Sequence, residues 1–193
     1  MTRRRLDPAA RRAELVSTGA RLFSAKPYDE VLMEDVADEA GVSRALLYRY
    51  FPTKSDLFAA VYRQAADSLL SRAHFDPDAS IPGQISAALE AHFDYFAANR
   101  NTVLAANRTL AGDRGVQAVI DDELAVLRER LLDAGRIPDE VRGAVSAVVL
   151  SWLVFVRTLC IEWLTAESFT REQLHDMCVG SLLGALRNIV ELE

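Results

Sequence analysis

Residues 33–57, MEDVADEAGVSRALLYRYFPTKSDL, predict two short helices joined by a tight turn, followed by the start of a third helix. Gly41 can adopt the positive φ that ends the first helix and redirects the chain. Ser43 follows as a candidate N-cap for the second helix, in which Leu47 and Phe51 lie four residues apart on one face. The stretch therefore predicts a helical hairpin whose second helix buries one side and exposes the other.

The exposed side of this second helix, called the reading helix below, carries a cation, a small residue and an aromatic hydroxyl: Arg44, Ala45 and Tyr48. A helix of this kind can enter the major groove of DNA with its N-terminal side chains at base edges, while the preceding helix crosses the backbone. A hairpin whose outer face is merely solvated is the alternative interpretation.

The turn after the reading helix favours the DNA interpretation. Pro52 ends that helix, and Thr53 with Asp56 forms a capping-box arrangement that opens the next one. Lys54 lies in that first turn, where the helix dipole disfavours a cation. A DNA phosphate at this place would be attracted by both the ammonium and the free N–H groups.

From about Arg11 to Leu57 the chain resembles the DNA-binding domain of the TetR family of transcriptional regulators. The resemblance covers about the first third of the chain and rests on Leu22-Phe23, Val36-Ala37, Ala40-Gly41-Val42-Ser43, Leu47-Tyr48-Arg49-Tyr50-Phe51 and Lys54-Ser55-Asp56-Leu57. Three positions depart from the family pattern: Pro27 replaces a common Gly, Leu32 a capping Ser or Thr, and Leu46 puts an apolar residue on the reading helix.

This resemblance implies an all-α fold with an N-terminal three-helix DNA-binding domain that contains a helix-turn-helix, and a C-terminal helical bundle for ligand binding and dimerisation. We place the DNA-binding domain at residues 1–54, a linking helix at about 54–72 and the effector-binding and dimerisation domain at 73–193. Helical periodicity continues to the C-terminus, where Thr170 and Gln173 predict a capping box.

We expect double-stranded DNA to be contacted by the reading helix, the turn after it and the arginine-rich N-terminus. The predicted contacts are Ser43, Arg44, Ala45, Leu46, Tyr48, Arg49, Tyr50, Thr53, Lys54, Arg3, Arg4 and Arg5. Arg44 and Tyr48 are assigned to bases or adjacent phosphates, and Tyr50, Thr53 and Lys54 to the backbone. A solvated tail is the alternative interpretation of the three N-terminal arginines.

The charge distribution agrees with a DNA-facing end on an acidic body. The 193 residues carry a net charge of −6, yet residues 1–54 hold ten Lys and Arg against eight Asp and Glu, whereas residues 55–193 hold twelve against twenty. The three histidines and two cysteines share no metal-ligand spacing, and the chain has no catalytic motif. We therefore expect a protein that is not an enzyme and has no cofactor or metal.

A cytoplasmic location is expected from the lack of export and membrane signals. The N-terminus has no apolar region after its arginines, so it does not predict a signal peptide. No segment approaches the ~18 to 20 apolar residues that span a bilayer, and the nearest, residues 143–156, is too short.

The last two helices predict a homodimer. Residues 144–164 are apolar on nearly every face, as in a helix enclosed on all sides, and the final helix has two apolar faces. One face, through Leu174, Cys178, Leu182 and Ala185, is assigned to the core of the subunit. The other is assigned to a symmetry mate through Met177, Gly180, Ser181, Gly184 and Asn188. A thicker monomeric core is the alternative.

TetR relatives typically bind a small molecule in the helical body, so the resemblance implies an effector. Our candidate contacts are His92, Phe93, Phe96, Asn107, Trp152, Phe155, Arg157 and Cys160, although each by itself also suits an ordinary core. A cation in an otherwise apolar helix needs a carboxylate, water or ligand, and either Glu162 or Asp94 could satisfy Arg157 internally, so an anionic effector stays open.

These observations predict a sequence-specific, DNA-binding transcriptional regulator. It would be a homodimeric repressor, released from a palindromic operator by a small, largely apolar ligand. One rival is a DNA-binding protein of the same fold that has no small-molecule effector and answers to a protein partner or acts structurally on the chromosome. A helical-bundle enzyme is the other, and the sequence offers it no spaced catalytic set.

Overall fold

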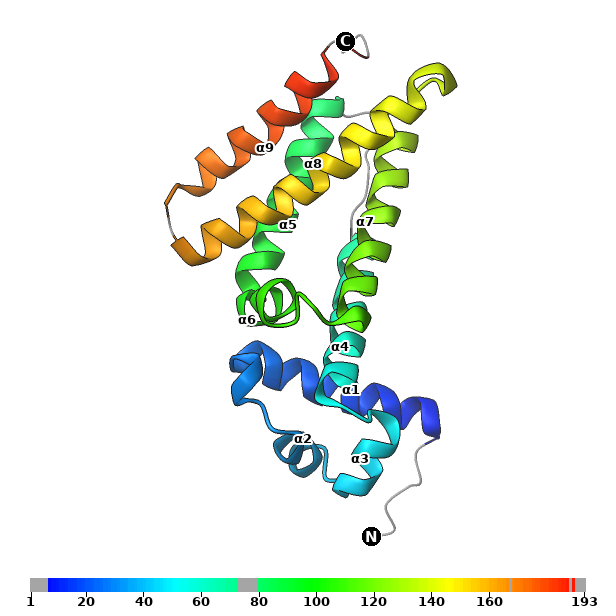
Figure 1. Ribbon diagram of the computed structural model, residues 1–193, viewed down its shortest axis with the longest axis vertical. Coiled ribbons are helices and arrows are strands. Elements are labelled where there is room, and N and C mark those ends of the chain that lie inside the picture. The colour runs from blue at the N-terminus through cyan, green and yellow to red at the C-terminus, as the bar shows by residue number, and fades with distance from the viewer. Residues whose placement is uncertain (1–6, 73–79, 167, 188, 190–193) are drawn as a thin grey trace. The chain divides into compact units, whose positions relative to one another are not determined.

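The computed structural model describes residues 7–72, 80–166, 168–187 and 189, and within these ranges all regular structure is helical (Figure 1). The predicted all-α fold is confirmed. By its internal packing the chain divides into two compact units. Unit 1 comprises Met1–Ala66 and Asn99–Val119, and unit 2 comprises Asp67–Ala98 and Ile120–Glu193.

Unit 1 contains the helical hairpin that the sequence predicts. Its elements are α1 (Pro8–Ala25), the 3₁₀ turn η1 (Tyr28–Glu30), α2 (Met33–Glu39), α3 (Arg44–Tyr50), the first part of α4 (Lys54–Arg72), α6 (Arg100–Leu104), the π-helical turn η2 (Ala105–Thr109) and the start of α7 (Arg114–Ala134). Helix α1 crosses α4 closely at Gly19, where an added Cβ would lie 3.2 Å from Val61 and 3.3 Å from Leu57. A larger residue at Gly19 would require the Val61 and Leu57 side chains to shift by a few tenths of an ångström.

The turns of the hairpin form as predicted. Gly41 has a φ of 60°, and the next N–H, from Val42, donates to the carbonyl of Ala37 at 2.9 Å. Ser43 Oγ accepts from Leu46 N at 3.2 Å and caps α3. Thr53 and Asp56 exchange the two hydrogen bonds of a capping box, at 3.0 and 3.1 Å. Helix α3, the reading helix, is therefore fixed at both ends by local contacts.

Residues 99–119 pack within unit 1, although the sequence places them in the effector domain. The Asn101 side-chain amide donates to Ser24 O at 2.9 Å, and Thr102 Oγ1 donates to Phe23 O at 3.5 Å. Carbonyls in the last turn of a helix have no partner within the helix, so α6 supplies what α1 lacks. The chain thus passes from unit 2 into unit 1 and returns along α7.

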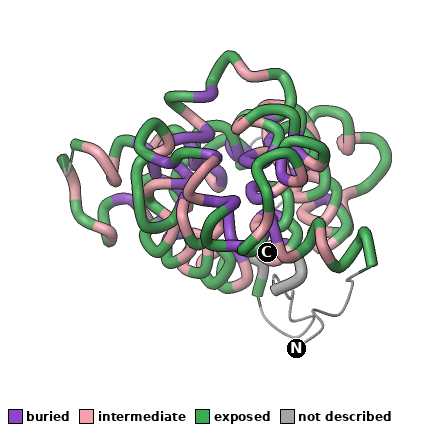
Figure 2. Tube along the Cα trace, turned by 90° about the horizontal axis from the view of Figure 1, so that it is seen from below, coloured by how far each residue is buried: buried purple, intermediate pink, exposed green. Residues whose placement is uncertain are grey.

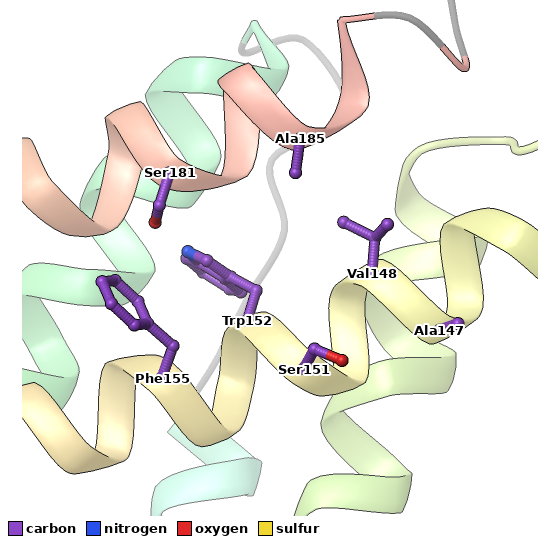
Figure 3. A pocket seen from close by; sticks show the side chains of 7 residues that line it. All are labelled: Ala147, Val148, Ser151, Trp152, Phe155, Ser181 and Ala185. Atoms are coloured by element: carbon purple, nitrogen blue, oxygen red, sulfur yellow. The ribbon is translucent and has the colours of Figure 1, made fainter.

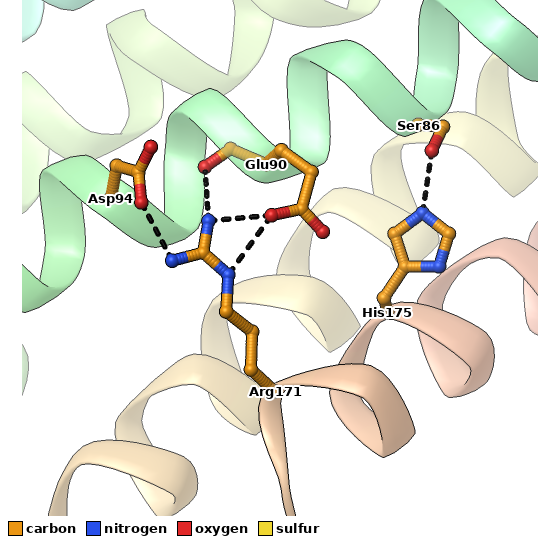
Figure 4. A network of polar contacts seen from close by, with 5 residues as sticks. All are labelled: Ser86, Glu90, Asp94, Arg171 and His175. Atoms are coloured by element: carbon orange, nitrogen blue, oxygen red, sulfur yellow. Dashed lines mark hydrogen bonds and ion pairs between the residues drawn. The ribbon is translucent and has the colours of Figure 1, made fainter.

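Unit 2 is built from α5 (Ile81–Ala98), the rest of α7, α8 (Asp139–Ala166) and α9 (Arg171–Leu186), with α8 packed against both α5 and α9. Polar contacts join α9 to α5, as Figure 4 shows. Arg171 donates to Glu90 at 2.5 and 2.9 Å and to Asp94 at 2.6 Å, and Ser86 Oγ lies 2.6 Å from His175 Nε2. Thr170 and Gln173 form the predicted capping box at the start of α9.

The structure corrects two predictions about the final helices. Helix α8 is not enclosed on all sides within the chain, because Ala147, Ser151, Val154 and Phe155 are exposed along one face. On α9, Ala185 is exposed where the sequence placed it in the core, and Leu186 is buried instead. Figure 2 shows buried, intermediate and exposed positions following one another along the helical trace.

Helix α8 also corrects the prediction about membrane-length segments. Among the described residues, Asp139–Ala166 is the one helix long and apolar enough to cross a bilayer by length and composition, with a mean hydropathy of 2.1 in its best window. The stretch 143–156 named in the sequence analysis stops before Arg157, whereas the helix continues through this cation to Ala166. Of that window, 44% is buried inside the structure.

Candidate nucleic-acid interface and effector region

The exposed face of α3 carries the side chains that the sequence assigns to DNA. The Arg44 side chain is 63% exposed and Tyr48 is 43% exposed, whereas Leu47 on the opposite face is fully buried. Of the other predicted contacts, Ser43, Ala45, Arg49 and Thr53 are exposed, and Leu46, Tyr50 and Lys54 are half-buried. Arg3, Arg4 and Arg5 lie outside the described residues. Unit 1 therefore presents a connected polar face, while the contacts with DNA stay predictions.

An ion pair that the sequence analysis missed lies beside this face. Arg44 Nη1 is 3.2 Å from Oε1 of Glu34, which lies in the first turn of α2. The sequence signal was an acid on the first helix of the hairpin and a cation at the start of the second. Only the angle between the two helices decides that these side chains meet.

Lys54 has an intramolecular role that its sequence position did not indicate. Its Nζ donates to Tyr28 O at 2.9 Å and to Val31 O at 3.1 Å, and it lies 4.2 Å from the centroid of the Tyr28 ring. The ammonium therefore holds η1 and the chain after it against the start of α4. Contact between Lys54 and a DNA phosphate stays a prediction, and this site competes with it.

We expect Lys54→Met to lower the free energy of unfolding by about 1–3 kcal/mol, since hydrogen bonds from a charged donor are lost. Thermal denaturation measures the change. Lys26→Met removes the other lysine of the chain from an exposed position and is the matched control. Equal melting temperatures for both variants would mean that the Lys54 contacts contribute nothing to stability and that its ammonium is free for phosphate.

Unit 2 contains a buried group of charged and aromatic side chains: Arg157, Glu123 and Phe96. Arg157 Nη2 is 2.7 Å from Glu123 Oε2 in a buried ion pair, and the guanidinium lies 5.9 Å from the centroid of the Phe96 ring. The sequence analysis named Glu162 and Asp94 as acids that could satisfy Arg157, and it did not name Glu123. The partner is Glu123 on α7, and Asp94 pairs with Arg171. The pair brings no net charge to the interior.

His92 packs on the ring of Phe96, which the Arg157 guanidinium also contacts. Its ring centroid lies 4.1 Å from that of Phe96, and its Nε2 is buried with no hydrogen-bond partner among the described residues. Burial, and secondarily the charge of Arg157, lowers the pKa of His92 to about 3. The ring is therefore neutral at pH 7, and its Nε2 is left for a partner of matching hydrogen-bonding character.

We expect acidification from pH 7 to pH 5 to lower the free energy of unfolding by about 1–2 kcal/mol through His92. The unfolded histidine takes up a proton near its ordinary pKa of 6.5, while the folded one stays neutral until about pH 3, so the unfolded state binds more protons in this window. Urea denaturation at both pH values measures the loss. His92→Phe should lose less stability than the wild type, and an equal loss would contradict the buried neutral ring.

The remaining effector candidates do not all join this group. Phe93 and Cys160 are buried in unit 2, and Trp152 donates its indole N–H to Cys178 O at 2.7 Å. Phe155 is 40% exposed on α8, and Asn107 belongs to η2 of unit 1, where it donates to Val103 O at 2.8 Å. The ring and ion-pair contacts thus connect His92, Phe96 and Arg157.

Both cysteines are free and buried, as predicted. Burial raises the pKa of the Cys160 thiol to about 12, with the nearby Cys178 adding to the shift and Arg157 opposing it. Burial alone raises the pKa of Cys178 to about 12. Both thiols are protonated at neutral pH and are poor nucleophiles.

An open groove runs between α8 and α9 on the exposed side of unit 2 (Figure 3). It is lined by Ala147, Val148, Ser151, Trp152, Phe155, Ser181 and Ala185. The predicted dimer residues Met177, Gly180, Ser181 and Gly184 are exposed along α9, and an added Cβ at either glycine meets nothing within 4 Å. Asn188 lies outside the described residues.

The α2–α3 hairpin, the exposed cationic face of α3 and the helical bundle of unit 2 are together the features of a helix-turn-helix DNA-binding protein. Residues 15–61 match the model of the family described as "Bacterial regulatory proteins, tetR family". This part of the chain therefore carries the DNA-binding domain of that family.

Curated relatives align with part of the chain. The transcriptional activator FasR of Mycolicibacterium smegmatis is 33% identical over 93 residues, which are 47% of this chain and 42% of FasR. The transcriptional regulator RutR of Escherichia coli K12 is 35% identical over 97 residues, 48% of this chain and 46% of RutR. The chain thus spans less than half the length of either relative.

Solved structures extend the likeness of fold to nearly the whole chain. A tetR-family transcriptional regulator from Streptomyces coelicolor superposes with a TM-score of 0.81 at 24% identity, covering 95% of this chain and 83% of that one. The transcriptional regulator FadR from Bacillus subtilis, solved in complex with stearoyl-CoA, superposes with a TM-score of 0.64 at 14% identity, covering 90% of this chain and 98% of that one.

Proposed function

We propose that the protein is a cytoplasmic, homodimeric transcriptional repressor, which a small and largely apolar ligand releases from a palindromic operator. The observation that carries the proposal is the α3 face, where exposed Arg44 and Tyr48 project from a helix capped at Ser43 and packed through Leu47. Such a face fits the major groove, with side chains at base edges. The proposal includes no enzymatic step.

The exposed side of α8 and α9 supports the homodimer. Apolar Val154 and Phe155 are exposed on α8, and on α9 an added Cβ at Gly180 or Gly184 meets nothing within 4 Å, which leaves room for another backbone. Two α8–α9 pairs related by a two-fold axis would bury these residues as a four-helix interface. The two reading helices would then address half-sites one DNA turn apart, roughly 34–36 Å, or a multiple of it.

The group around Phe96 supports an effector in unit 2. The Arg157–Glu123 pair is internally neutral, and His92 is neutral, so this interior suits an uncharged or mostly apolar molecule better than an anion. The B. subtilis FadR structure contains stearoyl-CoA, a molecule with a long apolar chain. Helix α5, which carries His92 and Phe96, leads within a few residues to α6, whose Asn101 and Thr102 hold the end of α1.

This covalent path gives the ligand a way to alter DNA binding. A ligand that displaces α5 would move the residues that cap α1 in unit 1. The effector shifts the balance between two forms only by binding one of them better, and a tenfold change in DNA affinity needs about 1.4 kcal/mol of difference.

Selection of binding sites from random-sequence duplex DNA tests the proposal. The full-length protein should enrich a palindrome, and its affinity should fall steeply as salt is raised, because phosphate contacts release counterions. Enrichment of no site, or equal affinity for all sequences, would overturn it. Long-chain alcohols added to the operator complex then test release, with glycerol as the polar control.

Arg44→Ala should weaken binding to the selected site by about 1–3 kcal/mol and relax the preference at one base pair of each half-site, since a bidentate base contact is lost. Fluorescence anisotropy with operator and base-substituted duplexes measures both effects. Arg128→Ala, which removes a cation from α7 in unit 2, is the control. Unchanged base preference in Arg44→Ala would place the reading contacts elsewhere.

A second candidate function is structural binding to the chromosome without a small-molecule effector. The nucleoid occlusion factor SlmA of Shewanella amazonensis is 35% identical to the chain over 66 residues, 34% of each protein. A solidly packed unit 2 that gives no thermal shift with apolar ligands would favour this alternative. Loss of operator binding on adding such a ligand would exclude it.

A further inference from the structure

The contact between Glu34 and Arg44 joins the two helices of the hairpin across their turn. Arg44 is the first residue of α3 and its side chain is 63% exposed, while the Glu34 side chain is 36% exposed. Their charged groups approach to 3.2 Å. The foremost cation of the reading helix is therefore already bound to an acid when the protein is free.

Both ends of this contact are held firmly by the packing of unit 1. Glu34 lies between buried Met33 and buried Val36 on α2, so the direction of its side chain follows from the burial of its neighbours. The start of α3 is fixed by the Ser43 cap. Neither helix has to move for the ion pair to persist while α3 lies in a groove.

The Glu34–Arg44 ion pair by itself should contribute little to the stability of the fold. Exposed ion pairs contribute only about 0.2–1 kcal/mol in most proteins. The guanidinium, however, has five N–H groups, and the contact with Glu34 engages Nη1. The edge formed by Nε and Nη2 stays available, and two N–H groups on one edge match the O6 and N7 acceptors of guanine.

The negative charge of Glu34 has a second effect, which is on the affinity for DNA of any sequence. Non-specific DNA binding depends on cations near phosphates, and a carboxylate 3.2 Å from Arg44 offsets that attraction. A guanine offers two acceptors to the free edge of Arg44 and adenine only one, while the nearby carboxylate offsets part of the charge attraction to any phosphate. Orientation and charge offset therefore act in the same direction, toward a larger ratio of specific to non-specific binding.

We propose that Glu34 is a specificity-determining residue of the DNA interface, which orients Arg44 toward a guanine of each half-site and lowers affinity for other DNA. The proposal rests on the proposed function, because it needs a selected operator. It assigns to α2 a role in base recognition that the exposed face of α3 alone does not contain.

The test compares Glu34→Gln with Asp35→Asn, which removes one negative charge from the neighbouring position of the same helical turn. Binding of each full-length variant is measured across salt with three duplexes: the selected operator, the operator with the guanine opposite Arg44 replaced by adenine, and a random sequence. That guanine is located as the position at which Arg44→Ala loses its preference. Circular dichroism melting monitors the fold.

For Glu34→Gln we expect tighter binding to random DNA by several-fold and discrimination against adenine reduced by about tenfold, the equivalent of part of one bidentate contact. Asp35→Asn should also bind random DNA more tightly but keep the discrimination of the wild type. The double variant Glu34→Gln, Arg44→Ala should discriminate no worse than Arg44→Ala alone, because both changes act on one interaction.

Two results would overturn the inference while leaving the function intact. One is wild-type discrimination in Glu34→Gln at a position where Arg44→Ala has lost it. The other is an equal loss in Asp35→Asn, since a general change of charge would then explain the effect. Failure of the wild type to enrich any site would instead defeat the proposed function, before the variants are compared.

Discussion

Glu123→Ala should lower the free energy of unfolding of unit 2 by about 3–5 kcal/mol. The change leaves the Arg157 guanidinium buried without its carboxylate, and an uncompensated charge in a protein interior is far more costly than the loss of one hydrogen bond. Both tryptophans of the chain, Trp152 and Trp163, belong to unit 2, so their fluorescence in a urea titration follows this unit.

The double variant Glu123→Leu, Arg157→Met is the control for this prediction. It replaces both charges by apolar side chains of similar size, and we expect it to recover most of the stability, because well-packed apolar pairs often equal buried ion pairs. A stable Glu123→Ala protein would mean that water reaches Arg157. A double variant as unstable as the single one would mean that shape, rather than charge, governs the site.

Gly184→Glu should convert the proposed dimer to monomers and weaken operator binding by about 10²–10⁴-fold, since two linked reading helices bind far more tightly than one. An added Cβ at Gly184 meets nothing within 4 Å in the single chain and the position is exposed, so the subunit itself should fold normally. Two new carboxylates facing each other across a two-fold axis would repel and would also fill the space for the partner's backbone.

Light scattering during size-exclusion chromatography measures this outcome. The wild type should have twice the 21.4 kDa mass of the chain, and Gly184→Glu the single mass. Gly112→Glu places the same residue at another exposed glycine with open space around it, in unit 1, and should stay dimeric. Monomeric wild-type protein would remove the homodimer from the proposal, and a dimeric Gly184→Glu would place the interface on other residues.

The sequence by itself determined the local features of this protein. The positive φ of Gly41, the cap at Ser43 and the capping boxes at Thr53 and Thr170 were all predicted correctly. Each depends on contacts between residues within five positions of one another, so the pattern of the chain contains the whole interaction. The resemblance to the tetR family followed from the same part of the chain, because most of its motifs lie in the hairpin and residues 15–61 match the family model.

Only the tertiary structure decided which distant groups meet. Lys54 binds carbonyls of the segment around η1, Arg157 pairs with Glu123 on another helix, and Arg44 contacts Glu34 across the turn. Periodicity shows that a buried or crowded charge needs a partner, but several acids and carbonyls satisfy that need equally well in the sequence. The angle and register at which helices pack choose among them, and these are set by the fit of apolar surfaces from remote parts of the chain.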